Sequence, residues 1–279
     1  MNETRPSPIA GMWYPGNPVQ LTSEIKQYLS LVNQQPISGK ILALVVPHAG
    51  YRYSGKTAAH AYAAIADKSI ETIFLLSPYH DFHPAELLAT VHQAYQTPLG
   101  DVPINQEMMQ QMNQILLQKA GITIQQIRRD REHSLEIQLP FLQTVLKNNF
   151  NIVPLMVRSR DPQFCRNLGE IIANLFNPEK HLIIASTDLS HFYPEKTANQ
   201  LDQTMLNMVS SLNPDGVFSA EEEEIGYACG AGALAATLWA AKKLSADQCD
   251  ILHYTTSAEV TGDSQSVVGY GAAAIYKRL

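Results

Sequence analysis

Runs of consecutive apolar residues alternate along the chain with segments of helical spacing. Four runs have the length of a strand that is buried on both faces: 41–46, 72–76, 151–157 and 181–186. Spacing and composition predict helices over 21–32, 55–66, 105–119, 132–142, 161–176, 199–212 and 226–244, with closing strands over 251–257 and 266–276. This alternation predicts an α/β fold with a central, mostly parallel sheet flanked by helices on both sides. No segment has the composition of a linker, so we expect one domain over 1–279.

Three of the apolar runs are followed closely by a histidine. Pro47 and His48 follow the run 41–46, and the run 72–76 leads through Ser-Pro-Tyr to His80. The run 181–186 leads to Asp188 and His191. Because ligands bind beyond the carboxyl ends of strands in open α/β sheets, a shared edge with three histidines is a candidate site. The 32 residues between the first two histidines match one strand–helix–strand unit, which predicts neighbouring strands.

These residue types suit a metal or acid/base site. Neutral imidazole is a common ligand for zinc, iron and copper, so His48, His80 and His191 could converge on one metal ion. Asp188 could be a ligand, a base or a carboxylate that orients a ligand. Each histidine taken alone is equally well explained as a hydrogen-bonded residue at a strand end.

Cys229 lies among glycines and alanines at the start of the helix predicted over 226–244. A helix N-terminus lowers the pKa of a thiol and favours the thiolate, which binds metal or attacks an electrophile. The alternative is a small buried cysteine that fills a tight packing site.

Two further groups of residues are candidates for a role at the site. Tyr51, Arg52 and Tyr53 follow His48 and could bind an anionic or aromatic ligand, or form a stacked surface cluster. Glu132 and His133 begin the helix predicted over 132–142, which Ser134 would cap and Pro140 would bend or break. This pair could support the site from outside the metal ligands, although capping and ion pairing explain it equally well.

Composition excludes several classes of protein. The net charge of −6, with scattered basic residues, argues against nucleic-acid binding. The N-terminal residues lack the apolar core of a signal peptide, and the longest mostly apolar stretch, 227–241, is too short to span a bilayer. Three cysteines without framework spacing favour a reducing, cytoplasmic setting. Neither a phosphate-binding glycine loop nor a nucleophile-elbow serine is present.

The ordered set of motifs resembles the Memo family, which is related to class III extradiol dioxygenases. The matching segments are Ala10-Gly11-Met-Trp13-Tyr14-Pro15, Pro47-His48-Ala-Gly-Tyr-Arg-Tyr-Ser-Gly55, Ser77-Pro-Tyr-His80, Glu132-His-Ser-Leu-Glu-Ile-Gln-Leu-Pro140, Ser186-Thr-Asp-Leu-Ser-His191, Cys229-Gly230, and Gly262-Asp263 with Val267-Val-Gly-Tyr270. The resemblance implies one α/β domain of the dioxygenase type and a site formed by His48, His80, His191 and Cys229. In the related dioxygenases two histidines and a carboxylate bind Fe(II), so the resemblance implies metal binding by His48, His80 and Cys229.

This chain departs from the family pattern in two places. A thiolate in place of the carboxylate makes the site softer, so copper and zinc are candidates beside Fe(II). The family usually has Gly-Pro-Ser-His-His where this chain has Ser77 to Asp81, with His83 two residues on. Asp81 and His83 are therefore the candidates for an outer supporting role. Prokaryotic relatives are named with a radical-SAM protein, which implies a partner in the same pathway.

Three functions follow as hypotheses. The first is a metal-binding, iron-dependent redox enzyme that acts on an unknown small molecule, with His191 and Asp188 as catalytic groups. The second is a non-catalytic module that binds a peptide or protein in a dioxygenase-like pocket. The third is a metal hydrolase that uses Asp188 or His191 as its base.

Overall fold

A mixed β-sheet of nine strands runs through the centre of the protein. The computed structural model describes residues 4–278. In these residues the strand order is β10-β12-β2-β9-β3-β8-β4-β7, and β11 pairs with β12 beside β10. The strands are β2 (Lys40–Val46), β3 (Thr72–Ser77), β4 (Leu87–Thr90), β7 (Gln125–Ile127), β8 (Asn151–Val157), β9 (His181–Ser186), β10 (His191–Tyr193), β11 (Gln248–Thr256) and β12 (Val267–Lys277).

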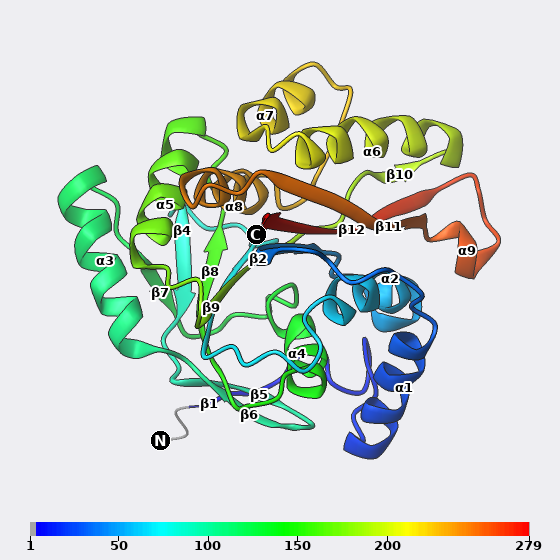
Figure 1. Ribbon diagram of the computed structural model, residues 1–279, viewed down its shortest axis with the longest axis horizontal. Coiled ribbons are helices and arrows are strands. Elements are labelled where there is room, and N and C mark those ends of the chain that lie inside the picture. The colour runs from blue at the N-terminus through cyan, green and yellow to red at the C-terminus, as the bar shows by residue number, and fades with distance from the viewer. Residues whose placement is uncertain (1–3, 279) are drawn as a thin grey trace.

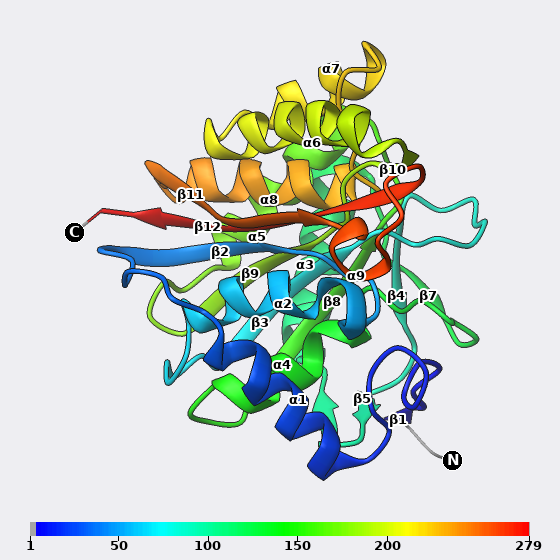
Figure 2. The same cartoon turned by 90° about the vertical axis from the view of Figure 1, so that its right-hand side faces the viewer.

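Helices cover both faces of this sheet (Figures 1 and 2). On one face lie α5 (Pro162–Leu175), α6 (Glu195–Ser210) and α8 (Ala231–Lys243), with α7 (Pro214–Glu222) packed on α8 and α3 (Gln106–Ala120) packed on α5. On the other lie α1 (Pro18–Ser30), α2 (Tyr51–Ala63) and α4 (Leu139–Val145), the last preceded by the 3-10 turn η1 (Glu136–Gln138). The short α9 (Ala258–Thr261) joins β11 to β12. The α/β fold predicted from the apolar runs is confirmed.

The central strands are the most apolar, because both of their faces are covered. Strands β2, β9, β3 and β8 pair in parallel, and antiparallel strands extend the sheet on both sides. The sheet is therefore parallel at its centre and mixed as a whole. The prediction that β2 and β3 are neighbours is wrong, because β9 lies between them and pairs with both. Their carboxyl ends still open at the same edge.

Several segments differ from the predicted helices. Helix α6 begins at Glu195 rather than at residue 199, and α8 begins at Ala231 rather than at residue 226, so Cys229 precedes this helix. Helix α2 begins at Tyr51 rather than at residue 55, with Gly50 before its first turn. The segment predicted as one helix over 132–142 is irregular up to η1, and Pro140 lies in the first turn of α4, where its missing N–H costs nothing. Ser134 caps neither element, because its hydroxyl donates to the Glu132 carboxylate (2.7 Å).

A smaller sheet joins the N-terminus to the middle of the chain. It consists of β1 (Thr4–Arg5), β5 (Ala94–Thr97) and β6 (Gly100–Pro103). Among residues 4–278, none of the helices has the length and apolar character needed to cross a membrane.

Candidate metal centre

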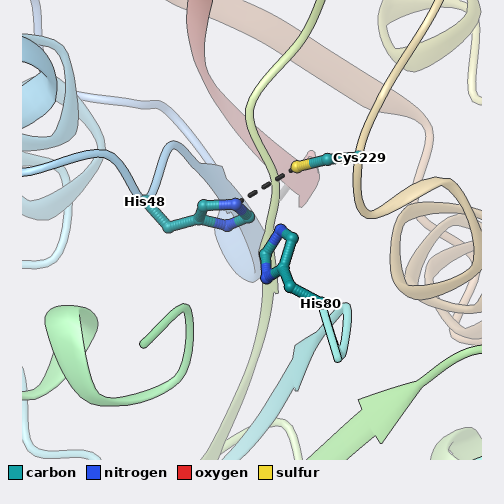
Figure 3. Close-up of side chains that lie close together, drawn as sticks. All are labelled: His48, His80 and Cys229. Atoms are coloured by element: carbon teal, nitrogen blue, oxygen red, sulfur yellow. Dashed lines mark hydrogen bonds between the residues drawn. The ribbon is translucent and has the colours of Figure 1, made fainter. Parts of the chain in front are cut away.

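Two strand ends and one helix start bring His48, His80 and Cys229 together (Figure 3). His48 follows β2, His80 follows β3, and Cys229 lies two residues before α8. One ligand atom from each of the three residues lies within 4.8 Å of the other two. The metal ligands expected from the sequence are therefore close enough to share one ion.

A buried hydrogen-bond network fixes the protonation of His48. The Ser186 hydroxyl donates to the Ser134 carbonyl (2.7 Å) and accepts from Gln138 Nε2 (2.8 Å). Its remaining lone pair faces His48 Nδ1 at 3.0 Å, so Nδ1 is the protonated nitrogen and donates. His48 Nε2 then keeps a lone pair toward Cys229 Sγ, 3.2 Å away. Burial, together with His133 and His80, lowers the pKa of His48 well below its usual range.

Glu132 orients His80 in the same way. Its carboxylate accepts from the His80 backbone N–H (2.7 Å) and from His80 Nδ1 (3.0 Å). Burial alone would lower the pKa of His80, but Glu132 outweighs this effect and raises it. Burial alone would raise the pKa of Glu132, but His80 and His133 hold it below its usual range. His80 Nε2 is thus left as the atom that can bind a metal.

His80, Glu132 and His133 also lie close enough together to suggest a second metal site. Glu132, however, already accepts from the backbone N–H groups of His133 and Ser134 (both 2.9 Å) and from the Ser134 hydroxyl. With the two bonds from His80, its lone pairs are occupied. This group therefore orients His80 rather than binding an ion of its own.

Cys229 is held at its sulfur by backbone and side-chain groups. The Asp188 N–H donates to Sγ (3.2 Å), and the thiol has two acceptors in reach, His48 Nε2 at 3.2 Å and the Asp188 carbonyl at 3.6 Å. Burial and the nearby Asp188 carboxyl raise the pKa of Cys229, contrary to the lowered pKa expected at a helix start. A metal ion bound here would displace this thiol proton.

Asp188 and His191 lie beside the three ligand residues. Asp188 Oδ1 accepts from the His48 backbone N–H (2.7 Å), and its Oδ2 is 3.9 Å from His48 Nε2. Burial raises the pKa of Asp188 to about 7, although backbone N–H groups of His48 and Ala49 oppose this. His191 Nδ1 donates to the Leu189 carbonyl (2.8 Å), which leaves Nε2 unprotonated, and burial lowers the pKa of His191. Both residues line the same pocket as His48 and His80.

This pocket has a volume of about 540 Å³ and an open mouth. Its lining includes His133, which stacks on His80 (4.8 Å between ring centroids) and packs at a tilted angle against Trp13 (4.2 Å). Burial lowers the pKa of His133 to about 4. The lining also includes Arg52, Tyr53, Val268 and Tyr270.

Three residues proposed from the sequence lie away from the pocket. Tyr51 is buried in the first turn of α2, where it packs on Phe141 and donates to the Ile137 carbonyl (2.8 Å). Its place in the pocket was predicted from its neighbours in sequence, but the helical turn directs Arg52 outward and Tyr51 into the core. Asp81 is exposed, and His83 Nδ1 accepts from the Ala85 N–H (3.1 Å). Neither Asp81 nor His83 lines the pocket, because the chain turns outward after His80.

Several residues that shape the site were not predicted from the sequence. Ser186 and Gln138 fix His48, and Trp13 and Tyr270 line the pocket. Trp13 and its neighbour Tyr14 do carry a signal in the sequence, since an aromatic pair in an irregular segment must pack against something. Ser186 is a small residue at a strand end, and no local pattern distinguishes it.

Comparison with known proteins agrees with these motifs. A family model described as "Memo-like protein" matches residues 5–274. A MEMO1 family protein of Nitrosopumilus maritimus is 33% identical over 268 residues, which cover 95% of this chain and 96% of that protein. A MEMO1 family protein of Methanopyrus kandleri is 33% identical over 283 residues, covering 97% and 98% of the two chains.

A solved structure supports the fold. The crystal structure of an uncharacterised protein from Escherichia coli K12 superimposes with a TM-score of 0.55 at 12% identity, covering 84% of this chain and 99% of that chain. At this identity the likeness concerns the fold alone. The family model and the near full-length relatives show that this chain belongs to the Memo family.

Proposed function

We propose that this protein binds one metal ion through His48, His80 and Cys229, and that the ion is the centre of a redox enzyme acting on a small molecule. The observation that carries the proposal is the convergence of these ligand atoms within 4.8 Å. Ser186 and Glu132 support it, because they hold the Nδ1 protons and leave Nε2 of both histidines available.

The donor set suits Fe(II), with copper and zinc as alternatives. Two neutral imidazoles and one thiolate provide three ligands, which leaves coordination positions for a substrate. Bound Fe(II) would supply electron transfer and Lewis acidity beside His48 and His80, which line the pocket. The thiolate in place of a carboxylate is compatible with the softer ions as well.

The remaining residues would position a substrate and exchange protons with it. His191 presents Nε2, because its Nδ1 proton is held by the Leu189 carbonyl. The Asp188 carboxylate accepts from the backbone N–H of His48 and so orients the segment that carries this residue. The same carboxylate also lies close to the His48 imidazole. Trp13 and Tyr270 provide apolar walls for the substrate.

Anaerobic purification followed by elemental analysis tests this function. We expect about one equivalent of iron, copper or zinc per chain, and its loss in His48→Ala and Cys229→Ala. Cys249→Ala, which changes a cysteine on β11, is the matched control and should keep the metal. A wild-type protein that neither carries nor takes up any of the three metals would overturn the proposal. Turnover of a substrate by hydrolysis under strict anaerobiosis would favour the metal hydrolase instead.

A second candidate is a module that binds a peptide without catalysis. It is favoured by the apolar mouth of the pocket, where Met12 is 74% exposed and Tyr53 is 37% exposed, with Arg52 beside them. This function predicts partner binding that survives complete metal removal and is lost in Arg52→Gln. Binding that disappears with the metal would exclude it.

We also infer that the protein acts in the cytoplasm, since Cys165, Cys229 and Cys249 are all unpaired. A radical-SAM protein as a partner in the same pathway stays a prediction, which co-purification would test.

A further inference from the structure

Residues 4–16, here called the N-terminal strap, run along the side of the metal site. In Figure 2 the strap begins at β1, beside β5, and leads to α1. Its Trp13 packs on His133, and the Trp13 carbonyl accepts from the Tyr51 N–H (2.8 Å). The strap therefore contacts the segment that carries His133 and the first turn of α2, three residues after His48.

Arg5 is the one charged residue of the strap and is buried, with 1% of its surface exposed. Its guanidinium donates to Asp130 Oδ1 (2.7 Å), to the Glu132 carbonyl (2.6 Å) and to Glu136 Oε2 (2.7 Å). It also lies 4.8 Å from the ring centre of Tyr95. One side chain thus binds three points of the segment 130–136.

The segment 130–136 needs such support because most of it belongs to no helix or strand. Glu132 and Ser134 are buried there, and a buried irregular backbone depends on side chains for its hydrogen bonds. The strap also holds this segment by a side chain, because Glu136 Oε1 accepts from the Tyr14 hydroxyl (2.7 Å) and the Ser7 hydroxyl.

We propose that Arg5 is a positioning residue of the metal site. By fixing the backbone at Glu132, it places the carboxylate that holds the Nδ1 proton of His80 and so presents His80 Nε2 to the metal. This inference rests on the proposed metal-binding function. The burial of Arg5 and its three acceptors distinguish this role from that of a surface ion pair, which contributes little.

The substitution Arg5→Lys tests this role, because it keeps the positive charge and loses the planar set of donors. We expect zinc affinity, measured by competition with a chelator, to fall on the order of tenfold, as for other groups that orient a metal ligand. The matched control is Arg166→Lys, at an exposed pair with Glu170, and should bind zinc as the wild type does.

Nitrogen chemical shifts of His80 in the metal-free protein give a second readout that needs no metal. Signals are assigned by their loss in His80→Gln. At a pH above the pKa of His80, where the ring is neutral, we expect the Nδ1-protonated tautomer in the wild type and in Arg166→Lys, and a mixture of tautomers in Arg5→Lys. A folded Arg5→Lys protein with wild-type zinc affinity and a wild-type tautomer would overturn the inference. If the wild type binds no metal, the proposed function fails and the tautomer alone decides the role of Arg5.

If Arg5→Lys does not fold, Glu136→Gln replaces it. This variant keeps the volume of the side chain and removes one of the charges that anchor Arg5. A mixture of His80 tautomers in Glu136→Gln supports the positioning role of Arg5. An unchanged tautomer overturns it, because Arg5 would then contribute to folding alone.

Discussion

At the scale of single residues, three histidines share one hydrogen-bond arrangement. His48, His80 and His191 each donate from Nδ1, to Ser186, to Glu132 and to the Leu189 carbonyl respectively. The acceptors come from three different parts of the chain, yet each leaves Nε2 for the pocket. The sequence indicated these histidines, but their tautomers depend on partners that only the fold brings near.

Ser186→Ala removes the acceptor for the His48 Nδ1 proton. We expect zinc affinity to fall about tenfold, because the ring loses the partner that orients it. Stability should fall by about 1–3 kcal/mol, since the buried Gln138 amide loses an acceptor as well. Chelator competition and urea unfolding measure the two effects. The control Ser30→Ala, at an exposed position, should change neither zinc affinity nor stability. Equal zinc affinity in Ser186→Ala and Ser30→Ala would contradict the orienting role of Ser186.

Cys229→Asp replaces the thiolate with a carboxylate. We expect this variant to bind Fe(II) but to lose most of its affinity for Cu(I), because a carboxylate is a harder ligand than a thiolate. Cys229→Ala should bind both ions poorly. Parallel titrations with Fe(II) and Cu(I) under anaerobic conditions make the comparison, and an unchanged Cu(I) affinity in Cys229→Asp would show that the sulfur is not a ligand.

At the scale of elements, the site depends on how closely α8 approaches the ends of β9 and β8. A Cβ atom added at Gly230 would lie 2.8 Å from the Ser186 carbonyl oxygen, and one at Gly232 would lie 2.3 Å from that of Ser159. Glycine at these positions lets the start of α8 bring Cys229 to 3.2 Å from His48. The small residues around Cys229 thus have a packing reason that is compatible with its proposed role as a metal ligand.

Gly230→Ala should move the start of α8 and with it Cys229. We expect a loss of about 1–3 kcal/mol in stability from the steric overlap and a clear loss of zinc affinity, because metal sites tolerate shifts of only about 0.2 Å. Gly169→Ala is the matched control, because its Cβ would lie 2.4 Å from the carbonyl oxygen of Ala236. Ala236 also belongs to α8, but it lies seven residues after Cys229 and so away from the site. The control should lose stability and keep its zinc affinity. Equal zinc affinity in both variants would contradict this account of α8.

How much the sequence could predict differs between elements. Apolar runs located β2, β3, β8 and β9 to within a residue or two, because strands buried on both faces leave a continuous apolar signal. The insertion of β9 between β2 and β3 could not be predicted, since it depends on contacts more than 100 residues apart in sequence. Glu132 was predicted at a helix start, with a supporting role at the site as one alternative. Its bonds to His80 could not be predicted, because they join segments that no local pattern connects.

At the scale of the whole molecule, several histidines are kept neutral by burial. His60 on α2 and His253 on β11 stack with ring centroids 4.3 Å apart, beside Lys56, Glu259 and Thr57. Burial, then His253 and Lys56, lower the pKa of His60 from 6.5 to about 4. The contact between α2 and β11 therefore favours the neutral forms of the His60 and His253 imidazoles.

This contact predicts a loss of stability in acid. Between about pH 6.5 and pH 4 the unfolded chain binds more protons at His60 than the folded protein does, so stability falls as pH falls through this range. His60→Gln cannot titrate and should show a smaller difference between urea midpoints at pH 7 and pH 5. His48 and His133 contribute in the same direction and remain in both proteins. An identical pH dependence in the variant and the wild type would contradict the prediction.

The central claim is that His48, His80 and Cys229 bind one ion together. X-ray absorption at the zinc edge of the zinc-loaded protein tests it most directly, because zinc has no redox chemistry to complicate the sample. We predict one sulfur neighbour at about 2.3 Å and nitrogen neighbours at about 2.0–2.1 Å, with the sulfur absent in Cys229→Ala. A zinc ion surrounded only by nitrogen and oxygen in the wild type would contradict the account.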